Sequence, residues 1–183
     1  GGFPTLMQEM FGPGFKVHNL GICGATLGKR DKGKLGSLKP EVIVIKLGTN
    51  DAKPENWAKC KDQFGKNYGD FVDSLNTLVP RPRIYLVLPV PRFDKAEAAK
   101  NLAEEIVPLI RKVAADKGVE LIDCHTPFRD QGKVFVDGLH PGDAGQTMLA
   151  RIVYRTLTTV EKARVGVLDD KIEQYLSAPV GDR

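Results

Sequence analysis

The strongest constraint on the fold is an alternation of short apolar runs with amphipathic helical patterns. The runs Glu41 to Leu47 (EVIVIKL) and Arg83 to Leu88 (RIYLVL) are rich in β-branched residues and almost continuously apolar. Such runs are typical of parallel strands that are covered on both faces. Two further runs, Phe15 to Leu20 and Val119 to Ile122, predict two more strands.

Between the predicted strands, apolar residues recur at helical spacing. One such pattern runs from Phe64 to Leu78, a second from Leu102 to Val113, and a third begins near Asp143 and continues through Val153. Strands that alternate with amphipathic helices specify an α/β protein with a parallel sheet and right-handed crossovers. The 183 residues are enough for one such domain.

Charge and composition predict neither a nucleic-acid partner nor a membrane partner. The formal net charge is a modest +4. The one dense basic stretch, Lys29 to Lys34, is interrupted by Asp31 and has no aromatic platform after it, so a solvated loop is favoured. No apolar run approaches the roughly 20 residues that a membrane helix needs.

The sequence also predicts no cofactor and no metal. It has neither the spaced glycines of a dinucleotide-binding turn nor a Walker loop. The three histidines have spacings that match no ligand pattern (His18, His125 and His140). The three cysteines favour reduced thiols, with one disulfide and a leftover thiol as the alternative (Cys23, Cys60 and Cys124).

Glycine-rich or polar segments follow the predicted strands or precede the last helix. They are NLGICGAT (19–26), GTND (48–51), PVP (89–91) and DGLHP (137–141). Each segment alone has an ordinary explanation as a turn. Because ligands of open α/β sheets bind at the carboxyl ends of the strands, the four segments together predict a functional site.

These segments resemble the conserved blocks of the SGNH (GDSL-type) ester hydrolases, over about residues 3 to 158. The resemblance implies a flavodoxin-like three-layer α/β/α sandwich with a parallel sheet. It also implies that the Gly24 N–H and the Asn50 amide form an oxyanion hole. His140 is then the general base, and Asp137 orients it.

The narrower resemblance concerns the substrate. The segment GTNDAKPENW (48–57) is most similar to bacterial and carbohydrate-directed acyl esterases, including sialate O-acetylesterase-like proteins. This implies a small-molecule or carbohydrate acyl ester as the substrate and a secreted or periplasmic location, although no signal peptide is visible. The absence of a G-x-S-x-G elbow disfavours the common α/β-hydrolase fold.

Acyl transfer needs these residue types. Negative charge develops on the carbonyl oxygen, and each rigid donor aimed at that oxygen contributes about 3–4 kcal/mol. A glycine at position 24 is expected because a side chain would block the close approach of the backbone. The Asp-x-x-His spacing lets the carboxylate hold one imidazole nitrogen while the other faces the nucleophile.

The family's first block, Gly-Asp-Ser at the end of the first strand, is absent. Ser37, Ser74 and Ser177 stand in other contexts, so no nucleophile is recognised. We expect the sequence to begin just downstream of its catalytic serine, which a missing N-terminal segment of the same protein would supply.

The strand that carries this serine is central in the family's fold. Losing its buried side chains would cost roughly 5–10 kcal/mol, comparable to the stability of a whole domain. We therefore expect the slot between Phe15–Leu20 and Glu41–Leu47 to be filled. The candidates are a separate polypeptide segment, the tail strand Ala163 to Leu168 (ARVGVL), or a rearranged gene in which Val180 to Arg183 begins the missing block.

The predicted organisation is a hydrolase-like domain over residues 1–162 and a tail over 163–183. Three functions stay open. The first is an ester hydrolase whose serine lies outside the chain. The second is an inactive relative that binds an acylated sugar or a partner, and the third is an unrelated flavodoxin-like binding protein. The presence of both Asp137 and His140 favours the first, because a binding protein has no need of a base and its orienting acid.

Overall fold

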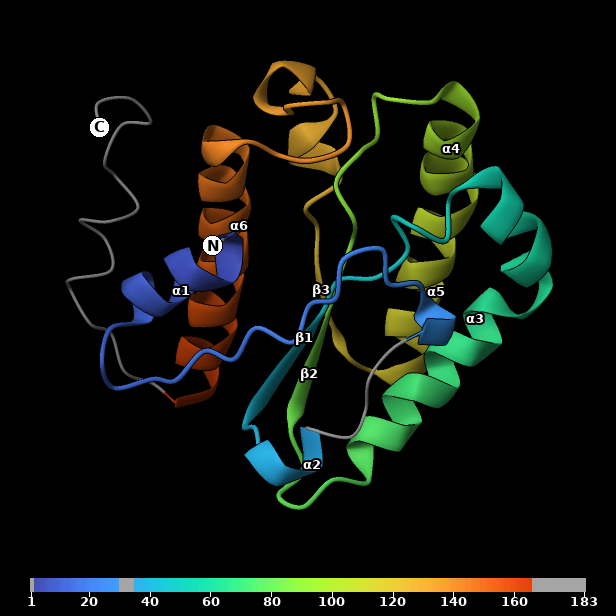
Figure 1. Cartoon of the computed structure of the whole chain (residues 1–183). Coiled ribbons are helices and arrows are strands. Elements are labelled where there is room, and N and C mark those ends of the chain that lie inside the picture. The colour runs from blue at the N-terminus through green and yellow to red at the C-terminus, as the bar shows by residue number, and fades with distance from the viewer. Residues whose placement is uncertain (1, 30–34, 166–183) are drawn as a thin grey trace. The chain divides into compact units, whose positions relative to one another are not determined.

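The computed structural model describes residues 2–29 and 35–165 of the chain (Figure 1). It divides into two compact units. One unit combines the residues up to Asn19 with those from Asp143 onward, and the other runs from Leu20 to Gly142.

The larger unit is built on a parallel sheet of three strands. These are β1 (Val42–Ile45), β2 (Arg83–Val87) and β3 (Glu120–Ile122), in the order β1-β2-β3. Val44 is paired with Tyr85, and Leu86 with Leu121. Three of the four predicted strands and the predicted α/β class with a parallel sheet are therefore confirmed.

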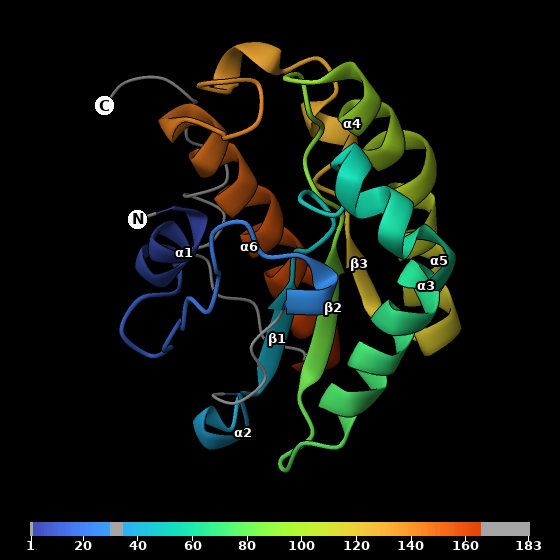
Figure 2. The same cartoon turned by 45° about the vertical axis from the view of Figure 1, so that its right-hand side comes forward.

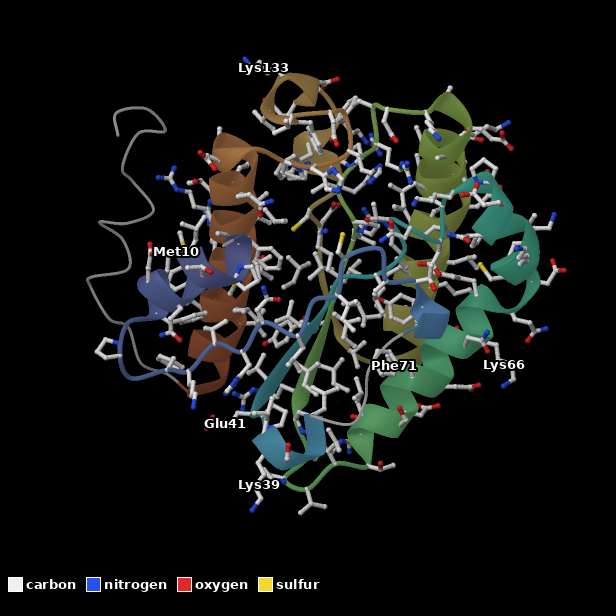
Figure 3. The ribbon with its side chains drawn as sticks, viewed as in Figure 1. Met10, Lys39, Glu41, Lys66, Phe71 and Lys133 are labelled. Atoms are coloured by element: carbon white, nitrogen blue, oxygen red, sulfur yellow. The ribbon has the colours of Figure 1, made fainter. Side chains whose placement is uncertain are left out.

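Helices of the larger unit cover one face of this sheet (Figures 1 and 2). They are α3 (Pro54–Asn76), α4 (Ala96–Lys100), the π-helical segment η2 (Asn101–Ile106) and α5 (Val107–Lys117). Their apolar faces share one core with the sheet, and its members include Phe64, Tyr68, Val72, Leu102, Ile106, Ile110, Ile43, Ile45 and Leu86. Figure 3 shows Phe71 on the side of α3 toward the sheet and Lys66 on the opposite side. The predicted helical faces are confirmed.

Local sequence explains where these helices begin, change and end. Pro54 opens α3, where its missing N–H leaves no bond unmade. Pro108 has no N–H for the Glu104 carbonyl, and the π-helical turns directly before α5 accommodate that gap. Gly118 ends α5 in the left-handed conformation that glycine adopts without strain.

Short elements complete the larger unit. They are the 3-10 turns η1 (Leu27–Lys29), η3 (Thr126–Phe128) and η4 (Gly132–Val134) and the short helix α2 (Leu35–Leu38). The turns η3 and η4 lie between β3 and the predicted DGLHP segment.

The smaller unit consists of α1 (Phe3–Phe11) packed on α6 (Asp143–Val165). The Phe3 N–H donates to the side-chain oxygen of Gln146 at 3.0 Å. The rings of Phe11 and Tyr154 lie 4.7 Å apart, centroid to centroid. The predicted last helix is confirmed, and it begins at Asp143.

The strand predicted at Phe15 to Leu20 is wrong, because the structure has irregular backbone there. The side chain of Gln8 binds backbone groups that would otherwise pair with a neighbouring β-strand. Its amide donates to the Phe15 carbonyl, and its oxygen accepts from the Val17 N–H. Phe15 is exposed. An apolar run becomes a strand only beside a neighbour that accepts its hydrogen bonds, and none is provided among the described residues.

The tail strand predicted from Ala163 to Leu168 is also wrong in its first part, because α6 continues through Val165. The rest of the tail, with Ser177 and Val180 to Arg183, lies outside the described residues, as does most of the basic stretch. Within the part of the chain that the structure describes, β1 has β2 on one side and no strand on the other.

The cysteines are free thiols in three different environments. Cys23 is exposed, Cys60 is half-buried and Cys124 is buried. Burial raises the pKa of the Cys124 thiol to about 12, so this thiol is protonated at neutral pH. No helix in the described ranges combines the length and the apolar character that a membrane crossing needs.

The core can be tested with two matched valines. Val72 on α3 is 0% exposed, whereas Val79 in the following loop is 84% exposed. We expect Val72→Ala to lower the free energy of unfolding by about 2 kcal/mol, since it removes two buried methyl groups and leaves a small cavity. Val79→Ala should change it by less than about 0.5 kcal/mol. Urea unfolding measures both, and equal effects would contradict the described core.

Candidate active site

The predicted site segments lie in loops of the larger unit. The segments after β1 and β2 start at Lys46 and Leu88, and the DGLHP segment follows η4. The loop that contains Gly24 precedes η1. Hydrogen bonds connect these four segments to one another.

Asp137 and His140 form a hydrogen-bonded pair. The Asp137 Oδ2 lies 2.7 Å from the Nδ1 of His140. The other carboxylate oxygen accepts the backbone N–H groups of Leu139 and His140, at 3.0 and 2.7 Å. The hydrogen bond predicted from the Asp-x-x-His spacing is present, and the carboxylate is held by its own loop.

The same contacts fix the charge of Asp137. The His140 ring, followed by the backbone N–H groups of His140 and Leu139, holds the pKa of the Asp137 carboxyl far below its usual range. A depressed pKa keeps the carboxylate ionised at neutral and mildly acidic pH. Because the His140 side chain is 66% exposed, its Nε2 side is accessible to a reactant.

Gly24 lies in a tight turn in which the Ala25 N–H donates to the Ile22 carbonyl. Its φ of +73° is the left-handed region that glycine adopts without strain. A Cβ at this position would meet no atom of the described chain within 4 Å. Glycine is required here by the backbone conformation, and the space beside it is open.

The side chains of Asn50 and Asp51 hold the Gly24 loop. The Asn50 amide donates to the Ala25 carbonyl at 3.0 Å, which leaves the second N–H of that amide for another acceptor. The Asp51 carboxylate accepts the Leu27 N–H at 2.9 Å. Asp51 is buried, and burial raises the pKa of its carboxyl. Neighbouring residues of the GTND segment therefore fix the chain directly after the turn at Gly24.

Arg92 is a buried residue that connects two of these segments and that the sequence pattern did not single out. Its side chain is only 1% exposed and makes a bidentate pair with Asp94, with N–O distances of 2.9 and 2.7 Å. The remaining nitrogen donates to the Thr49 carbonyl at 2.9 Å. Hydrogen bonds from Arg92 lower the pKa of the Asp94 carboxyl. The segment after β2 is thereby tied to the backbone directly before Asn50.

Gly138 ties the same segment to the Asp137–His140 loop. The Phe93 N–H donates to the Gly138 carbonyl at 2.7 Å. Gly138 has a φ of +75°, and a Cβ there would lie 2.9 Å from the Asp94 nitrogen and 3.0 Å from the Phe93 carbonyl carbon. Only glycine permits this approach of two backbones.

These contacts form a continuous connection from His140 to Gly24. It runs from the His140 loop through Phe93 and Arg92 to Asn50 and from there to the turn at Gly24. The order Arg-x-Asp, in the segment that follows a buried strand, was the one signal that pointed to the missed Arg92.

The other singled-out side chains have local partners. The Nδ1 of His125 lies 2.9 Å from the Pro89 carbonyl, so this nitrogen carries the proton, and burial lowers the pKa of the imidazole. The Ser74 hydroxyl donates to the Phe71 carbonyl within α3. In the part of the chain that the structure describes, no three His, Cys, Asp or Glu side chains are grouped to hold a metal ion.

Similarity to known proteins identifies the family. Residues 1–148 match the GDSL-like Lipase/Acylhydrolase family. The chain belongs to that family. The match covers the Gly24, Asn50 and Asp137–His140 segments of this GDSL-like domain.

Curated relatives of the GDSL-like domain are longer proteins. An acetylxylan esterase from Xylanibacter ruminicola is 32% identical over 83% of this chain and 38% of its own length. The human platelet-activating factor acetylhydrolase IB subunit alpha2 is 29% identical over 73% of this chain and 56% of its own length. The chain therefore spans between a third and three fifths of these two relatives.

Solved structures support the fold of the GDSL-like domain. An acetyl xylan esterase, AlAXEase, superposes with a TM-score of 0.72 at 23% identity, over 85% of this chain and 90% of its own. A catalytic mutant of the acetylxylan esterase Axe2 from Geobacillus stearothermophilus has a TM-score of 0.69 at 20% identity, over 85% and 80%. The SGNH resemblance drawn from the sequence is confirmed at the level of family and fold.

Two glycines with positive φ test the close approach at Gly138. Gly118 has a φ of +60°, and a Cβ added there would meet nothing within 4 Å, so Gly118→Ala should cost about 1–2 kcal/mol of stability from the backbone alone. Gly138→Ala should cost a further 1–3 kcal/mol or so, because backbone atoms must shift. Urea unfolding compares the two variants, and NMR of the His140 ring reports whether the loop moves. Equal costs and an unmoved ring would contradict the contact.

Proposed function

We propose that this domain is a carboxylic ester hydrolase that removes acyl groups, foremost acetyl groups, from carbohydrate. His140 is the general base, Asp137 orients it, and the Gly24 N–H and the Asn50 amide stabilise the oxyanion. The nucleophilic serine lies outside the 183-residue sequence. The single observation that carries the proposal is the Asp137–His140 pair, linked through the Arg92 segment to the Asn50–Gly24 loop.

The roles of Asp137 and His140 have support from a related structure. The Axe2 structures are described as catalytic mutants in which an aspartate and a histidine, three positions apart, were each changed to alanine. Asp137 and His140 have the same spacing and a 2.7 Å hydrogen bond. An ionised carboxylate beside Nδ1 stabilises the imidazolium that forms when Nε2 takes a proton.

The reaction then proceeds in two halves. Nε2 of His140 takes the serine proton as the serine oxygen bonds to the acyl carbon, and the carbonyl oxygen becomes an oxyanion. When the tetrahedral intermediate collapses, the bond to the sugar oxygen breaks and His140 returns the proton to that oxygen. Water repeats the sequence on the acyl-enzyme, releasing the carboxylic acid and restoring the serine.

The oxyanion donors are suited to this role. Within the described residues, the Gly24 N–H has no hydrogen-bond partner. The hydrogen bond that closes the turn is donated by the N–H of Ala25, the next residue along the chain. The Asn50 amide uses one N–H for the Ala25 carbonyl and keeps the other. Donors that are already fixed before the reaction need no reorganisation as charge develops.

The free edge of β1 supports a serine supplied on a separate strand. Among the described residues, β1 has no neighbour on the side away from β2. A strand that pairs there in parallel ends beside Gly48 to Asn50, so a residue at its carboxyl end reaches the edge of the sheet that holds the oxyanion donors. Carbohydrate specificity has support from the acetylxylan esterases among the relatives.

Completing the domain tests the missing nucleophile. The 183-residue chain alone should hydrolyse p-nitrophenyl acetate at no more than the residual rate of a triad hydrolase without its serine, about 10³–10⁴-fold over water. Co-expression with an upstream segment that ends in a Gly-Asp-Ser strand should raise kcat by orders of magnitude, and a Gly-Asp-Ala segment should not. Full activity of the chain alone would point to a residue within it, with Ser37 and Cys23 as the first to be tested.

Substitutions in the completed domain test the named roles. We expect His140→Ala to abolish the gain in kcat and Asn50→Ala to lower kcat about 10²–10³-fold, through the lost oxyanion donor. His18→Ala, at an exposed histidine of the smaller unit, is the matched control and should leave kcat unchanged. A completed, folded domain that is inert with every block present would instead favour a protein that binds acylated sugar without turnover.

A further inference from the structure

A cavity of about 500 Å³ lies in the larger unit, between the helical segment from α4 to α5 and the loop after β3. Its size falls within the range of small-molecule sites. None of the four proposed catalytic and oxyanion residues lines it. It shares only Arg92 and Phe93 with the connection from His140 to Gly24, so it is a separate site beside the proposed active site.

The cavity carries one positive charge in excess. Arg92 is neutralised by Asp94, and Arg111 by Asp123 at 2.6 Å. Arg129 lines the cavity and is exposed, and its guanidinium has no hydrogen-bond or ion-pair partner within the described ranges. His125 adds no charge at neutral pH, because burial lowers the pKa of its imidazole and its Nδ1 proton is held by Pro89.

One excess charge selects the kind of anion. A single carboxylate matches the free guanidinium of Arg129 with a planar, bidentate partner. A dianionic phosphate would carry a second negative charge that no cation in the lining is free to balance. The carboxylates of Asp94 and Asp123, although paired, would repel that second charge.

The rest of the lining is suited to the apolar face of a sugar ring. Phe93 is 42% exposed, and its ring is fixed by the ring of Phe135, at 5.0 Å between centroids. Ala99 of α4 and Ala103 of η2 also line the cavity, and their small side chains leave space in it for a ligand. A flat aromatic ring beside small apolar side chains offers contact area to C–H groups while the polar groups stay at the rim.

The cavity is also connected to the proposed active site. The Phe93 side chain lines it, and the Phe93 N–H donates to the Gly138 carbonyl of the Asp137–His140 loop. One residue therefore has its ring in the cavity wall and its backbone against the loop that carries the proposed base.

We propose that this cavity binds a sugar unit that bears a carboxylate, a uronic acid, on the same oligosaccharide as the ester, with Arg129 as the anion-recognising residue and Phe93 as the stacking surface. The assignment of the sugar to an ester substrate rests on the proposed function. The substrate class is thus an acylated polysaccharide with acidic branches.

Binding of ester-free sugars tests the cavity without any need for turnover. The 183-residue chain should bind a xylo-oligosaccharide with one glucuronic acid branch more tightly than the unbranched oligosaccharide of the same length, by isothermal titration calorimetry. Arg129→Gln should lower the affinity for the acidic oligosaccharide about fivefold relative to the unbranched one, as expected for the loss of one partly exposed ion pair. In the unsubstituted chain, 0.5 M NaCl should reduce the same preference.

Lys133→Gln is the matched control. It removes the same charge from the same loop, but Lys133 does not line the cavity and points away from the sheet (Figure 3). It should leave the binding of the acidic sugar unchanged. A second variant, Ala103→Leu, places a larger side chain in the cavity from an exposed helical position. It should weaken the binding of the acidic sugar, while an unchanged far-UV circular dichroism spectrum shows that the fold is retained.

The outcomes separate this proposal from the catalytic one. Equal affinity for the acidic and neutral sugars would overturn the proposed role of the cavity, and so would an equal loss of affinity in Arg129→Gln and Lys133→Gln. Either result would leave the esterase proposal untouched. Glucose 1-phosphate binding more tightly than glucuronate would overturn the carboxylate assignment. Selective binding of the acidic sugar by a completed domain without esterase activity would uphold the cavity and refute the proposed function.

Discussion

A buried guanidinium joins the loops of the larger unit. Arg92 is almost fully removed from water, and a buried charge of this kind costs several kcal/mol unless its guanidinium nitrogens have hydrogen-bond partners. Asp94 and the Thr49 carbonyl supply those partners, and the requirement to satisfy them fixes the segment after β2 against the backbone before Asn50. The parallel sheet brings the strand ends near one another, and the Arg92 contacts set how they meet.

The proposed base depends on this connection, because its own contacts are weak anchors. Exposed ion pairs contribute little to stability, and Asp137 and His140 are both exposed. Their loop is instead held by the backbone contact between Gly138 and Phe93, which a Cβ at Gly138 would prevent. One buried ion pair and one close approach of two backbones thus connect this loop to the segments that carry Asn50 and Gly24.

The sequence predicted the features that local pattern determines. The runs EVIVIKL and RIYLVL became strands because buried strands need continuous apolar sequence, and the Asp-x-x-His spacing fixed a contact within one short loop. The run at Phe15 to Leu20 did not form a strand, because a β-strand needs a neighbouring strand to pair with. The side chain of Gln8 binds the backbone groups of this run instead. Arg92 was missed because its partner Thr49 lies 43 positions away, a pairing that only the fold creates.

The most direct test of the central claim is a crystal structure of the complete protein after its serine has reacted with an organophosphonate, which mimics the tetrahedral intermediate. We predict that the phosphonyl oxygen accepts hydrogen bonds of about 2.7–3.1 Å from the Gly24 N–H and the Asn50 amide. The His140 ring should face the serine oxygen with its Nδ1 still bonded to Asp137. A phosphonyl oxygen bound by other donors, or a His140 ring turned away from the phosphorus, would contradict the claim that these loops form one acyl-transfer site.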